Sequence, residues 1–303
     1  MEVFPTYSAH HLSTPELVKQ RMRFITRFKQ IFTKNSPQTN AAANGHAAGK
    51  GFHLSVAQRT DVGRQRTHNE DNVAYIIPKN PTILAKKGAL FIVADGMGGH
   101  AAGEVASEMA VSTISTLYYQ DEVNDAPTCL FHAIKYANAA IYQRAIENTE
   151  HNGMGTTCVA AVLLGTTAYI ANVGDSRAYL VHRGRLRQVS QDHSWVAEQV
   201  RAGGMTEEEA RTHDMRNMIT RSLGPQPDIE VDLFVEEVEH GDALVLCSDG
   251  LHGMITDTEI LWLVEQFSPH ESVQRLIARA NAQGGLDNVT AIIARIFFER
   301  KHH

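Results

Sequence analysis

The sequence has few cysteines and lacks the spacings that cysteine-based sites need. Its 303 residues contain three, Cys129, Cys158 and Cys247, which are far apart, odd in number and free of any CxxC pattern. Disulfide frameworks and structural zinc sites both depend on paired or closely spaced cysteines. We therefore expect three reduced thiols inside a cytoplasmic protein, and neither a disulfide set nor a zinc site.

Long hydrophobic runs and a secretory leader are also lacking. The longest apolar run is far shorter than the roughly 20 residues of a membrane-spanning helix. Residues 1–14 mix polar residues with proline and histidine and show no signal-peptide pattern. The hydrophobic fraction of 43% is ordinary for a soluble protein with one large domain or two small ones.

Acidic residues outnumber basic ones beyond the first sixth of the chain. Residues 1–50 contain seven Lys/Arg and two Glu, a net charge of +5, so the other 253 residues must carry −11 to give the total of −6. An acidic body argues against nucleic-acid binding, which needs a basic surface. It is compatible with carboxylates gathered around a cation.

Composition divides the chain into three parts. Residues 35–51 are rich in Gly, Ala and Asn, cannot bury a core, and are predicted to form a flexible linker. Residues 1–34 contain a predicted helix over 15–33, with an apolar stripe on one side and basic residues on the other. Residues 52–300 form a body of the size of a catalytic domain.

The predicted N-terminal helix has three interpretations. Its apolar stripe is compatible with packing on its own domain or on a second copy, and with docking to a partner protein. Its basic face is also compatible with contact between residues 15–34 and a membrane surface. We favour a docking role, since few such stripes bind membranes.

The body combines strand patterns with pairs of helices. Runs rich in β-branched and aromatic residues predict strands within 72–77, 89–94, 156–164, 167–173, 177–184, 229–238, 242–248 and 288–298. Helices are predicted over 100–119, 128–148, 193–203, 256–267 and 270–283. Short turns join consecutive strands, and most helices are consecutive. This order predicts an α+β fold with antiparallel sheets and not regular βαβ units.

A glycine-rich stretch follows one predicted strand. In ALFIVADGMGGHAAGE, residues 89–104, the apolar run ends on Asp95 and four glycines follow. GMGGHA fits a dinucleotide-binding fingerprint, but the helix predicted at 100–119 is followed by another helix and not by a second parallel strand with a terminal acid. A Walker loop needs Lys and Ser/Thr, whereas Glu104 follows Gly103. A tight turn would explain one glycine, but not an acid where the strand ends.

Acidic residues recur at the ends of predicted strands. They are Glu70, Asp71, Asp95, Asp249 and Asp287, and Asp175 lies in a turn between two strands. Each one alone is most often a turn residue, but the repetition indicates a common site. Carboxylates that converge repel one another unless a cation lies between them, and oxygen-only ligands suit Mg²⁺ or Mn²⁺. The glycine after Asp95 would let a backbone carbonyl approach such an ion.

Eight motifs follow one another over about residues 54–298. They are RTHNEDN (66–72), VADGMGGHAAGEVAS (93–107), GMGTTCVAAVL (153–163), ANVGDSRAYL (171–180), VSQDHSW (189–195), ITRSLG (219–224), LCSDGLHGMI (246–255) and DNVTAII (287–293). Together they resemble the motifs of the type 2C metal-dependent serine/threonine protein phosphatases in their bacterial form. The resemblance implies a β-sandwich of two antiparallel sheets flanked by helix pairs, with a two-metal centre at one end.

The resemblance also implies a set of metal ligands. Asp95 is expected to bridge two Mn²⁺ or Mg²⁺ ions, and Gly96 to bind one of them through its carbonyl. Asp249 and Asp287 are expected to bind the other ion. Asp175 corresponds to the ligand of a third, weaker ion that it shares with Asp249.

Further residues match the parts of the family's site that handle water and phosphate. Glu70 and Asp71 correspond to acids that hold metal-bound water. Arg66 corresponds to the arginine that receives the substrate phosphate and would be catalytic together with the metal acids; an ordinary surface ion pair between Arg66 and Glu70 is the alternative. Met97 stands where some relatives have a histidine proposed as general acid, and nearness in sequence does not assign that role to His100.

The sequence therefore predicts an enzyme that hydrolyses phosphoserine and phosphothreonine in proteins with a metal-activated hydroxide, opposing a bacterial Ser/Thr kinase. The alternative is a catalytically silent relative that binds a partner, which the intact acids Asp95, Asp249 and Asp287 argue against. Residues 192–220 match a mobile flap beside the site and are a candidate for substrate selection, although a solvated helical face explains their charges equally well.

Overall fold

The computed structural model describes residues 45–49, 52–98, 102–151 and 153–298. The chain divides into two units between Ala41 and Ala42, and everything below concerns the second. The predicted helix over 15–33, with its predicted partner or membrane contact, lies outside the described residues. Within the described ranges, none of the helices combines the length and apolarity that crossing a membrane requires.

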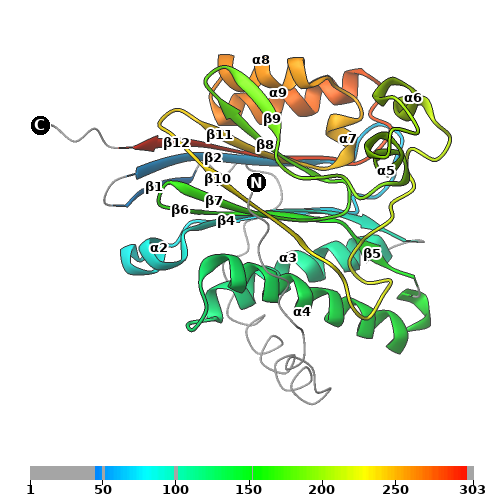
Figure 1. Ribbon diagram of the computed structural model, residues 1–303, viewed down its shortest axis with the longest axis horizontal. Coiled ribbons are helices and arrows are strands. Elements are labelled where there is room, and N and C mark those ends of the chain that lie inside the picture. Colours follow the sequence, from blue (N-terminus) through cyan, green and yellow to red (C-terminus); the bar gives the residue numbers. More distant parts are fainter. Residues whose placement is uncertain (1–44, 50–51, 99–101, 152, 299–303) are drawn as a thin grey trace, which may run out of the picture. The chain divides into compact units, whose positions relative to one another are not determined.

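Two antiparallel sheets form the centre of the domain (Figure 1). The first sheet has the order β1 (Gly45–Gly49), β2 (Phe52–Asp61), β12 (Val289–Phe298), β11 (Ala243–Cys247), β8 (Arg177–His182) and β9 (Arg185–Gln188). The second has the order β10 (Asp232–Glu237), β7 (Thr167–Val173), β6 (Cys158–Leu164), β4 (Ala89–Met97) and β3 (Asp71–Ile76). The short β5 (Gly155–Thr156) pairs with the end of β4.

The central strand β4 is apolar on both faces because both of its faces are covered. On β4, Phe91 and Val93 pack in the core between the two sheets, together with Leu244 of β11. The alternate residues Leu90 and Ile92 pack in a second core beneath the helices. All five side chains are fully buried. The run 89–94 is therefore continuously hydrophobic, because a strand buried on both faces loses the polar alternation of a surface strand.

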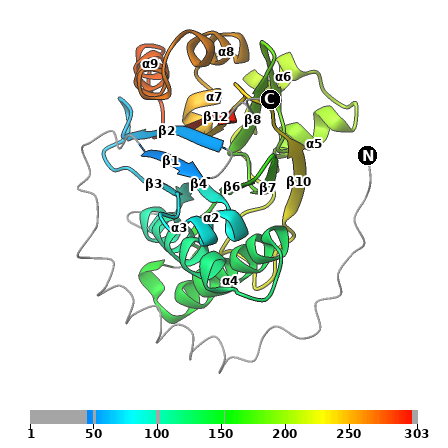
Figure 2. The same cartoon turned by 90° about the vertical axis from the view of Figure 1, so that its left-hand side faces the viewer.

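Helix pairs cover the outer faces of the sandwich, as Figures 1 and 2 show from two sides. α3 (Ala102–Gln120) and α4 (Ala126–Glu147) cover the second sheet, and α8 (Asp257–Gln266) and α9 (Pro269–Ala282) cover the first. α8 and α9 each begin with a capping box, in which the N-cap hydroxyl and a glutamate three residues later satisfy backbone amides. The shorter helices are α2 (Pro81–Lys87), α5 (Trp195–Arg201), α6 (Glu207–Thr212), α7 (Asp249–His252) and the 3₁₀ turn η1 (Thr149–His151).

The predicted fold class is confirmed, since two antiparallel sheets lie between helix pairs. The long predicted helices are present with their ends shifted by a few residues. The sequence prediction missed α2, α6 and α7, which have only four to seven residues each. Helices this short are set by caps and by packing, because a few residues cannot display a 3.6-residue period.

The predicted flexible linker over 35–51 is wrong at its C-terminal end. Residues 45–49 form β1, which pairs with β2 from Gly45 opposite Val56 to Gly49 opposite Phe52. The composition GHAAG favours a coil, but the open edge of β2 supplies hydrogen-bond partners for any backbone. Tertiary pairing thus overrides a weak local propensity, and the phosphatase-like body begins before residue 52.

Two truncations should separate the linker from the domain. Removing residues 1–41 is expected to leave the Tm unchanged, because that cut falls between the two units. Removing residues 1–50 also removes β1 and bares the edge of β2, so the Tm should fall by about 2–4 °C, the shift that corresponds to roughly 1 kcal/mol in a domain of this size. Differential scanning calorimetry measures both. Equal Tm values for the two truncations would contradict a structural role for β1.

Candidate metal and phosphate site

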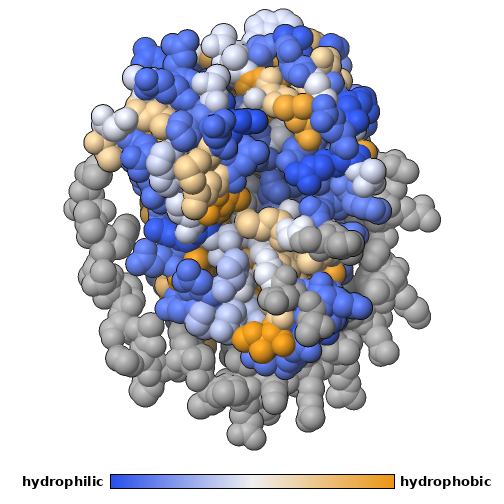
Figure 3. All heavy atoms as spheres, turned by 90° about the vertical axis from the view of Figure 1, so that its right-hand side faces the viewer, coloured by the Kyte–Doolittle hydropathy of each residue, from blue (hydrophilic) through white to orange (hydrophobic). Residues whose placement is uncertain are grey.

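The predicted site residues gather at one end of the sandwich because four strands begin or end there. Asp95 near the end of β4 pairs directly with Asp71 at the start of β3. Asp249 follows the end of β11 by two residues, and Asp287 precedes the neighbouring strand β12 by two. Antiparallel pairing brings the end of one strand beside the start of the next, so the fold collects acids that are far apart in sequence. Figure 3 views this end and shows mostly hydrophilic side chains on it.

The electrostatics confirm that the acids lie within range of one another. Burial, followed by the charges of Asp71, Asp249, Asp175 and Asp287, raises the pKa of Asp95 well above its usual range. Burial and the charge of Asp287 likewise raise the pKa of Asp249. Buried carboxylates with like-charged neighbours favour their protonated forms in this way.

Three carboxylate oxygens in this cluster are enclosed and have no hydrogen-bond partner. They are Oδ1 of Asp71, Oδ1 of Asp175 and Oδ1 of Asp249. A buried oxygen without a partner costs free energy, and native structures rarely leave one without a reason such as an ion. Oxygen atoms of this kind are the donors that Mg²⁺ and Mn²⁺ prefer, so the donor set fits the predicted metals.

Among the residues that the structure describes, no three His, Cys, Asp or Glu side chains are grouped closely enough to hold a metal ion as they stand. The evidence for a cation site is therefore the convergence of the acids at one end of the strands and their enclosed oxygens without partners.

Asp71 is oriented by hydroxyl groups from the first sheet. Its Oδ2 accepts hydrogen bonds from Ser248 Oγ at 2.8 Å and from Thr290 Oγ1 at 2.6 Å. Burial raises the pKa of Asp71 to about 7, although these two hydrogen bonds oppose the shift. One carboxylate oxygen is therefore fixed by two hydrogen bonds, and the other is buried without a partner. Sequence reasoning missed Ser248 and Thr290, although each lies close to a strand end that carries a predicted ligand.

The position of Asp95 is fixed through its backbone. Its amide donates to Thr157 Oγ1 at 3.0 Å. Its carbonyl accepts from the Thr157 amide and from Thr156 Oγ1, both at 2.8 Å. These bonds hold the end of β4 beside β5 through the backbone of Asp95 and do not use its side chain.

The glycines that follow Asp95 serve close packing between backbones. A Cβ on Gly96 would lie 2.2 Å from the Gly103 carbonyl oxygen and 2.5 Å from that of Glu70. A Cβ on Gly103 would lie 2.9 Å from the Glu70 carboxylate. The expected reason for Gly96, room for a cation, is therefore incomplete: the start of α3 and the loop before β3 already fill that space. The Gly96 amide donates to the Glu70 carbonyl at 3.1 Å and closes this junction.

The alternative interpretation of Arg66 was a surface ion pair with Glu70, but in the structure Arg66 pairs with Asp287. Its Nη2 donates to Asp287 Oδ2 at 2.8 Å, with the two side chains 49% and 34% exposed. This hydrogen bond raises the pKa of Arg66, and Glu70 contributes only through its charge. Burial raises the pKa of Glu70, against the lowering effect of Arg66. Arg66 thus lies at the open rim of the acid cluster.

Asn288 organises the loop that carries Arg66 and Glu70. Its Nδ2 donates to the carbonyls of Val62 and His68, both at 2.9 Å, and its Oδ1 accepts from the Glu70 amide at 2.8 Å. Sequence reasoning did not single out this residue. The only indication in the sequence was the position of Asn288 directly after Asp287. An asparagine side chain there has both donors and an acceptor with which to bond a neighbouring loop.

Asp175 lies in the turn between β7 and β8 and belongs to the same cluster. Burial, and then the charge of Asp249, raises its pKa well above the usual range. His252 Nε2 donates to the Asp175 backbone carbonyl at 3.0 Å. Because burial lowers the pKa of His252 to about 3, this histidine is neutral near pH 7 and holds the turn without adding charge.

Known sequences match this chain over most of its length. The protein phosphatase 2C family model matches residues 64–290. The serine/threonine phosphatase stp of Listeria welshimeri is 41% identical over 240 residues, which cover 78% of this chain and 93% of that protein. Protein phosphatase PhpP of Streptococcus pneumoniae is 36% identical over 244 residues, which cover 79% and 96%.

Solved structures match in fold as well. The Mycobacterium tuberculosis serine/threonine phosphatase PstP/Ppp has a TM-score of 0.72 and 37% identity over 80% of this chain and 98% of its own. The catalytic domain of PstP in complex with two manganese ions has a TM-score of 0.71 and 36% identity over 81% and 99%. The fold and its acids thus define a metal-dependent phosphoprotein phosphatase. This chain belongs to the protein phosphatase 2C family, in its bacterial serine/threonine form.

Proposed function

We propose that the chain removes phosphate from phosphoserine and phosphothreonine in proteins by a two-metal mechanism. In this proposal Asp95 would help to hold both of two Mn²⁺ or Mg²⁺ ions, the Gly96 carbonyl would help to hold one of them, and Asp249 and Asp287 would hold the other. The enclosed Oδ1 of Asp249, which has no partner, is the observation that carries it. The two manganese ions in the complex of the similar PstP catalytic domain are consistent with this choice.

The residues around the acids suit hydrolysis by water. Two bound divalent cations lower the pKa of a water molecule, so that hydroxide becomes available near neutral pH. Ser248 and Thr290 hold the Oδ2 of Asp71, and its Oδ1, which has no partner, would accept a hydrogen bond from this water. Glu70 offers a second acceptor from the same loop. Attack on phosphorus by water needs no covalent intermediate on the enzyme, and no nucleophilic side chain is required.

Arg66 is proposed to bind the substrate phosphate. Its guanidinium lies at the rim of the acid cluster and is half exposed, so an incoming phosphate can reach it. The planar fork of arginine matches two phosphate oxygens and offsets the charge that spreads over them during transfer. The ion pair with Asp287 would then guide Arg66 before substrate arrives.

The proposal also covers a third cation, the place of action and the catalytically silent alternative. Asp175 and Asp249 would share a third, weaker cation, which the partnerless Oδ1 of Asp175 supports. The enzyme would act in the cytoplasm on the targets of a Ser/Thr kinase. A catalytically silent relative is disfavoured because Asp95, Asp249 and Asp287 are all retained.

Phosphate release from a synthetic phosphothreonine peptide tests the proposed function. We expect release with Mn²⁺ and none with excess EDTA, because the carboxylates alone cannot lower the pKa of water. Malachite-green detection of phosphate measures both. A phosphotyrosine peptide of the same sequence is the matched substrate control and should react more slowly. Undiminished release in EDTA would contradict a metal-dependent reaction.

Replacing Arg66 by lysine should separate binding from chemistry. Lysine keeps the charge but loses the two-pronged contact, so we expect KM for the phosphothreonine peptide to rise about tenfold with a smaller change in kcat. The exposed Arg183, which pairs with Glu239 far along the chain, gives the control Arg183→Lys. Steady-state kinetics at saturating Mn²⁺ measure the effect. An unchanged KM would remove Arg66 from phosphate binding.

A further inference from the structure

The segment that was predicted to be a flap is closed at its base by its own two ends. Residues 195–218 form this flap, and residues 192–194 with 219–221 form its root. Ser194 and Ile219 make an isolated antiparallel bridge. The Trp195 amide donates to the Met218 carbonyl at 2.8 Å, and the Thr220 amide donates to that of His193 at 2.9 Å. These backbone hydrogen bonds fix the two ends of the flap to each other.

The root is bonded to the turn that carries Asp175. The His193 amide donates to the Gly174 carbonyl at 3.0 Å, and the Gly174 amide donates back to His193 Nδ1 at 3.0 Å. Asn172 Nδ2 adds bonds to the carbonyls of Gly174 at 3.1 Å and Gln191 at 2.8 Å. Because these bonds are reciprocal, the turn and the root form one unit, and a shift of one displaces the other.

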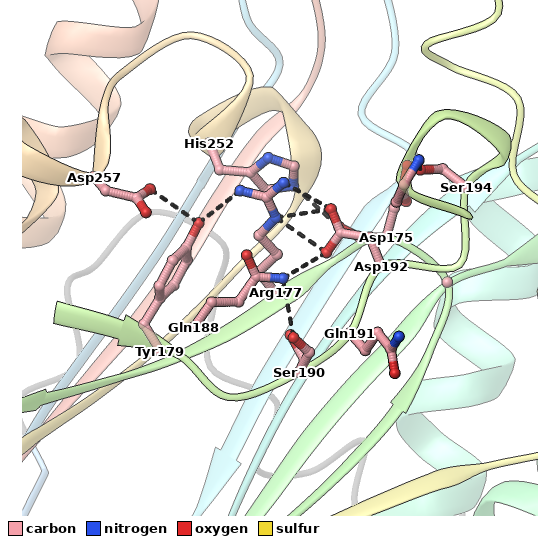
Figure 4. Close-up of polar contacts among 12 residues, drawn as sticks. Asp175, Arg177, Tyr179, Gln188, Ser190, Gln191, Asp192, Ser194, His252 and Asp257 are labelled. Atoms are coloured by element: carbon pink, nitrogen blue, oxygen red, sulfur yellow. Dashed lines mark hydrogen bonds and ion pairs between the residues drawn. The ribbon is translucent and has the colours of Figure 1, made fainter. Parts of the chain in front are cut away.

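An arginine at the start of β8 anchors this unit (Figure 4). Arg177 Nε donates to both oxygens of Asp192, at 3.1 and 3.0 Å, and its Nη2 donates to Oδ2 at 2.7 Å. Asp192 is only 8% exposed, so the pair is shielded from water. Gln188 Nε2 also donates to Asp192 Oδ1, at 2.7 Å. Every side-chain oxygen of this root carboxylate is therefore held by residues of the first sheet.

The anchor continues in two directions. Arg177 Nη1 donates to the Tyr179 hydroxyl at 3.0 Å, and that hydroxyl bonds to Asp257 at the start of α8 at 3.4 Å. On the flap side, Arg201 of α5 donates to the Asp192 carbonyl at 3.0 Å. Asp192 therefore bonds both to the first sheet, through its side chain, and to the flap, through its carbonyl.

A buried ion pair of this kind is weak evidence for stability alone, since apolar residues of similar volume often stabilise as well. The Arg177–Asp192 pair instead fixes one arrangement of the turn and the flap root. A second observation indicates the function of this arrangement. Asp175, two residues before Arg177, has a buried Oδ1 without a partner. The anchored turn therefore carries a buried carboxylate oxygen that is available to a ligand.

We propose that Arg177 and Asp192 are positioning residues, which fasten the flap root to the Gly174–Asp175 turn and so set both the cation affinity at Asp175 and the KM for phosphopeptides. The proposal rests on the proposed function of Asp175 as a ligand of the third cation. At saturating Mn²⁺ the cation sites are filled, and a substrate too small to reach the flap does not depend on the position of the flap. Peptide and small-molecule substrates should therefore respond differently when the anchor is weakened.

The variants Arg177→Lys and Asp192→Asn test the proposal, with Arg183→Lys as the matched control. Arg183 follows the other end of β8 and also forms a two-pronged pair, but an exposed one with Glu239. For the two anchor variants we expect KM for a phosphothreonine peptide to rise about tenfold, with kcat/KM for p-nitrophenyl phosphate within about twofold of wild type. The control should match wild type on both substrates.

Two readouts do not depend on turnover. Mn²⁺ titration followed by electron paramagnetic resonance should show a weakened weakest site in the anchor variants, with the tighter sites unchanged. Trypsin should cleave the flap faster in these variants, because Arg211 and Arg216 lie within it. An unchanged weakest site together with wild-type cleavage would overturn the proposal. Equal losses on both substrates with a lowered Tm would also overturn it, since they would indicate a structural role only.

The failure of this proposal and the failure of the proposed function give different results. If the wild-type protein with Mn²⁺ hydrolyses neither substrate, the assignment as an active phosphatase fails. The metal titration and the cleavage rates still decide whether Arg177 and Asp192 couple the flap to the cation at Asp175.

Discussion

Replacing Asp249 by asparagine is expected to lower kcat about 1,000-fold while the protein stays folded. Asp249 contributes a buried oxygen without a partner to the acid cluster, and an amide binds a divalent cation far more weakly than a carboxylate does. Cations in such a site supply several kcal/mol of transition-state stabilisation, and each 1.4 kcal/mol or so is a factor of ten in rate. Phosphate release from a phosphothreonine peptide at saturating Mn²⁺ measures the loss.

The same substitution should stabilise the metal-free protein. Burial and the charge of Asp287 raise the pKa of Asp249, so its ionised form is disfavoured in the fold, and asparagine removes that charge. In EDTA at pH 8 we expect the Tm of the variant to exceed that of wild type by about 2–4 °C. Asp228→Asn, the same change at an exposed acid paired with Lys135, should alter neither activity nor Tm. Full activity in Asp249→Asn, or a variant that fails to fold, would contradict its role as a ligand.

The stability of the metal-free protein should fall steeply as the pH rises from about 4 to 7. Burial raises the pKa of Asp71 from 3.8 to about 7 in the folded state. Below pH 3.8 the group is protonated in both states and costs nothing. As the pH rises, the unfolded chain ionises first, so the folded state loses stability until the pH passes about 7. A shift of this size corresponds to a loss on the order of 4 kcal/mol from Asp71 alone.

Thermal unfolding in EDTA and in Mn²⁺, at pH 5 and at pH 8, measures this effect. Without metal, the Tm should be higher at pH 5 than at pH 8 by several degrees. Saturating Mn²⁺ should abolish the fall, because bound cations favour the ionised acids and stabilise the folded state by mass action. Asp71→Asn should show a flatter profile than wild type in EDTA. Parallel profiles for wild type and Asp71→Asn would show that Asp71 does not titrate in this window.

The strand-end acids show why much of this site could be predicted from the sequence. An apolar run that ends in Asp-Gly, as at Asp95 and Asp249, marks a residue whose backbone is buried and whose side chain must leave the core. Since antiparallel strands place alternate ends at the same edge, acids with this pattern converge without any knowledge of loop structure. Patterns of two and of 3.6 residues likewise indicated most helices and strands.

Other features depend on contacts that leave no local pattern. β1 forms because β2 has an open edge, and a sequence as bland as GHAAG carries no signal of its partner strand. Gly96 was explained by a cation, whereas the backbone of Gly103 occupies the space where its Cβ would lie. The anchor between Arg177 and Asp192 joins residues 15 apart, and charge alone did not distinguish them from solvated residues.

Anomalous diffraction from a crystal grown with Mn²⁺ tests the central claim most directly. That claim is that carboxylates from separate strands enclose a pair of divalent cations beside Asp95. The account predicts two manganese peaks that both contact the Asp95 carboxylate, one of them also bound by Asp249 and Asp287. A structure in which manganese avoids Asp95, or binds elsewhere on the protein, would contradict it.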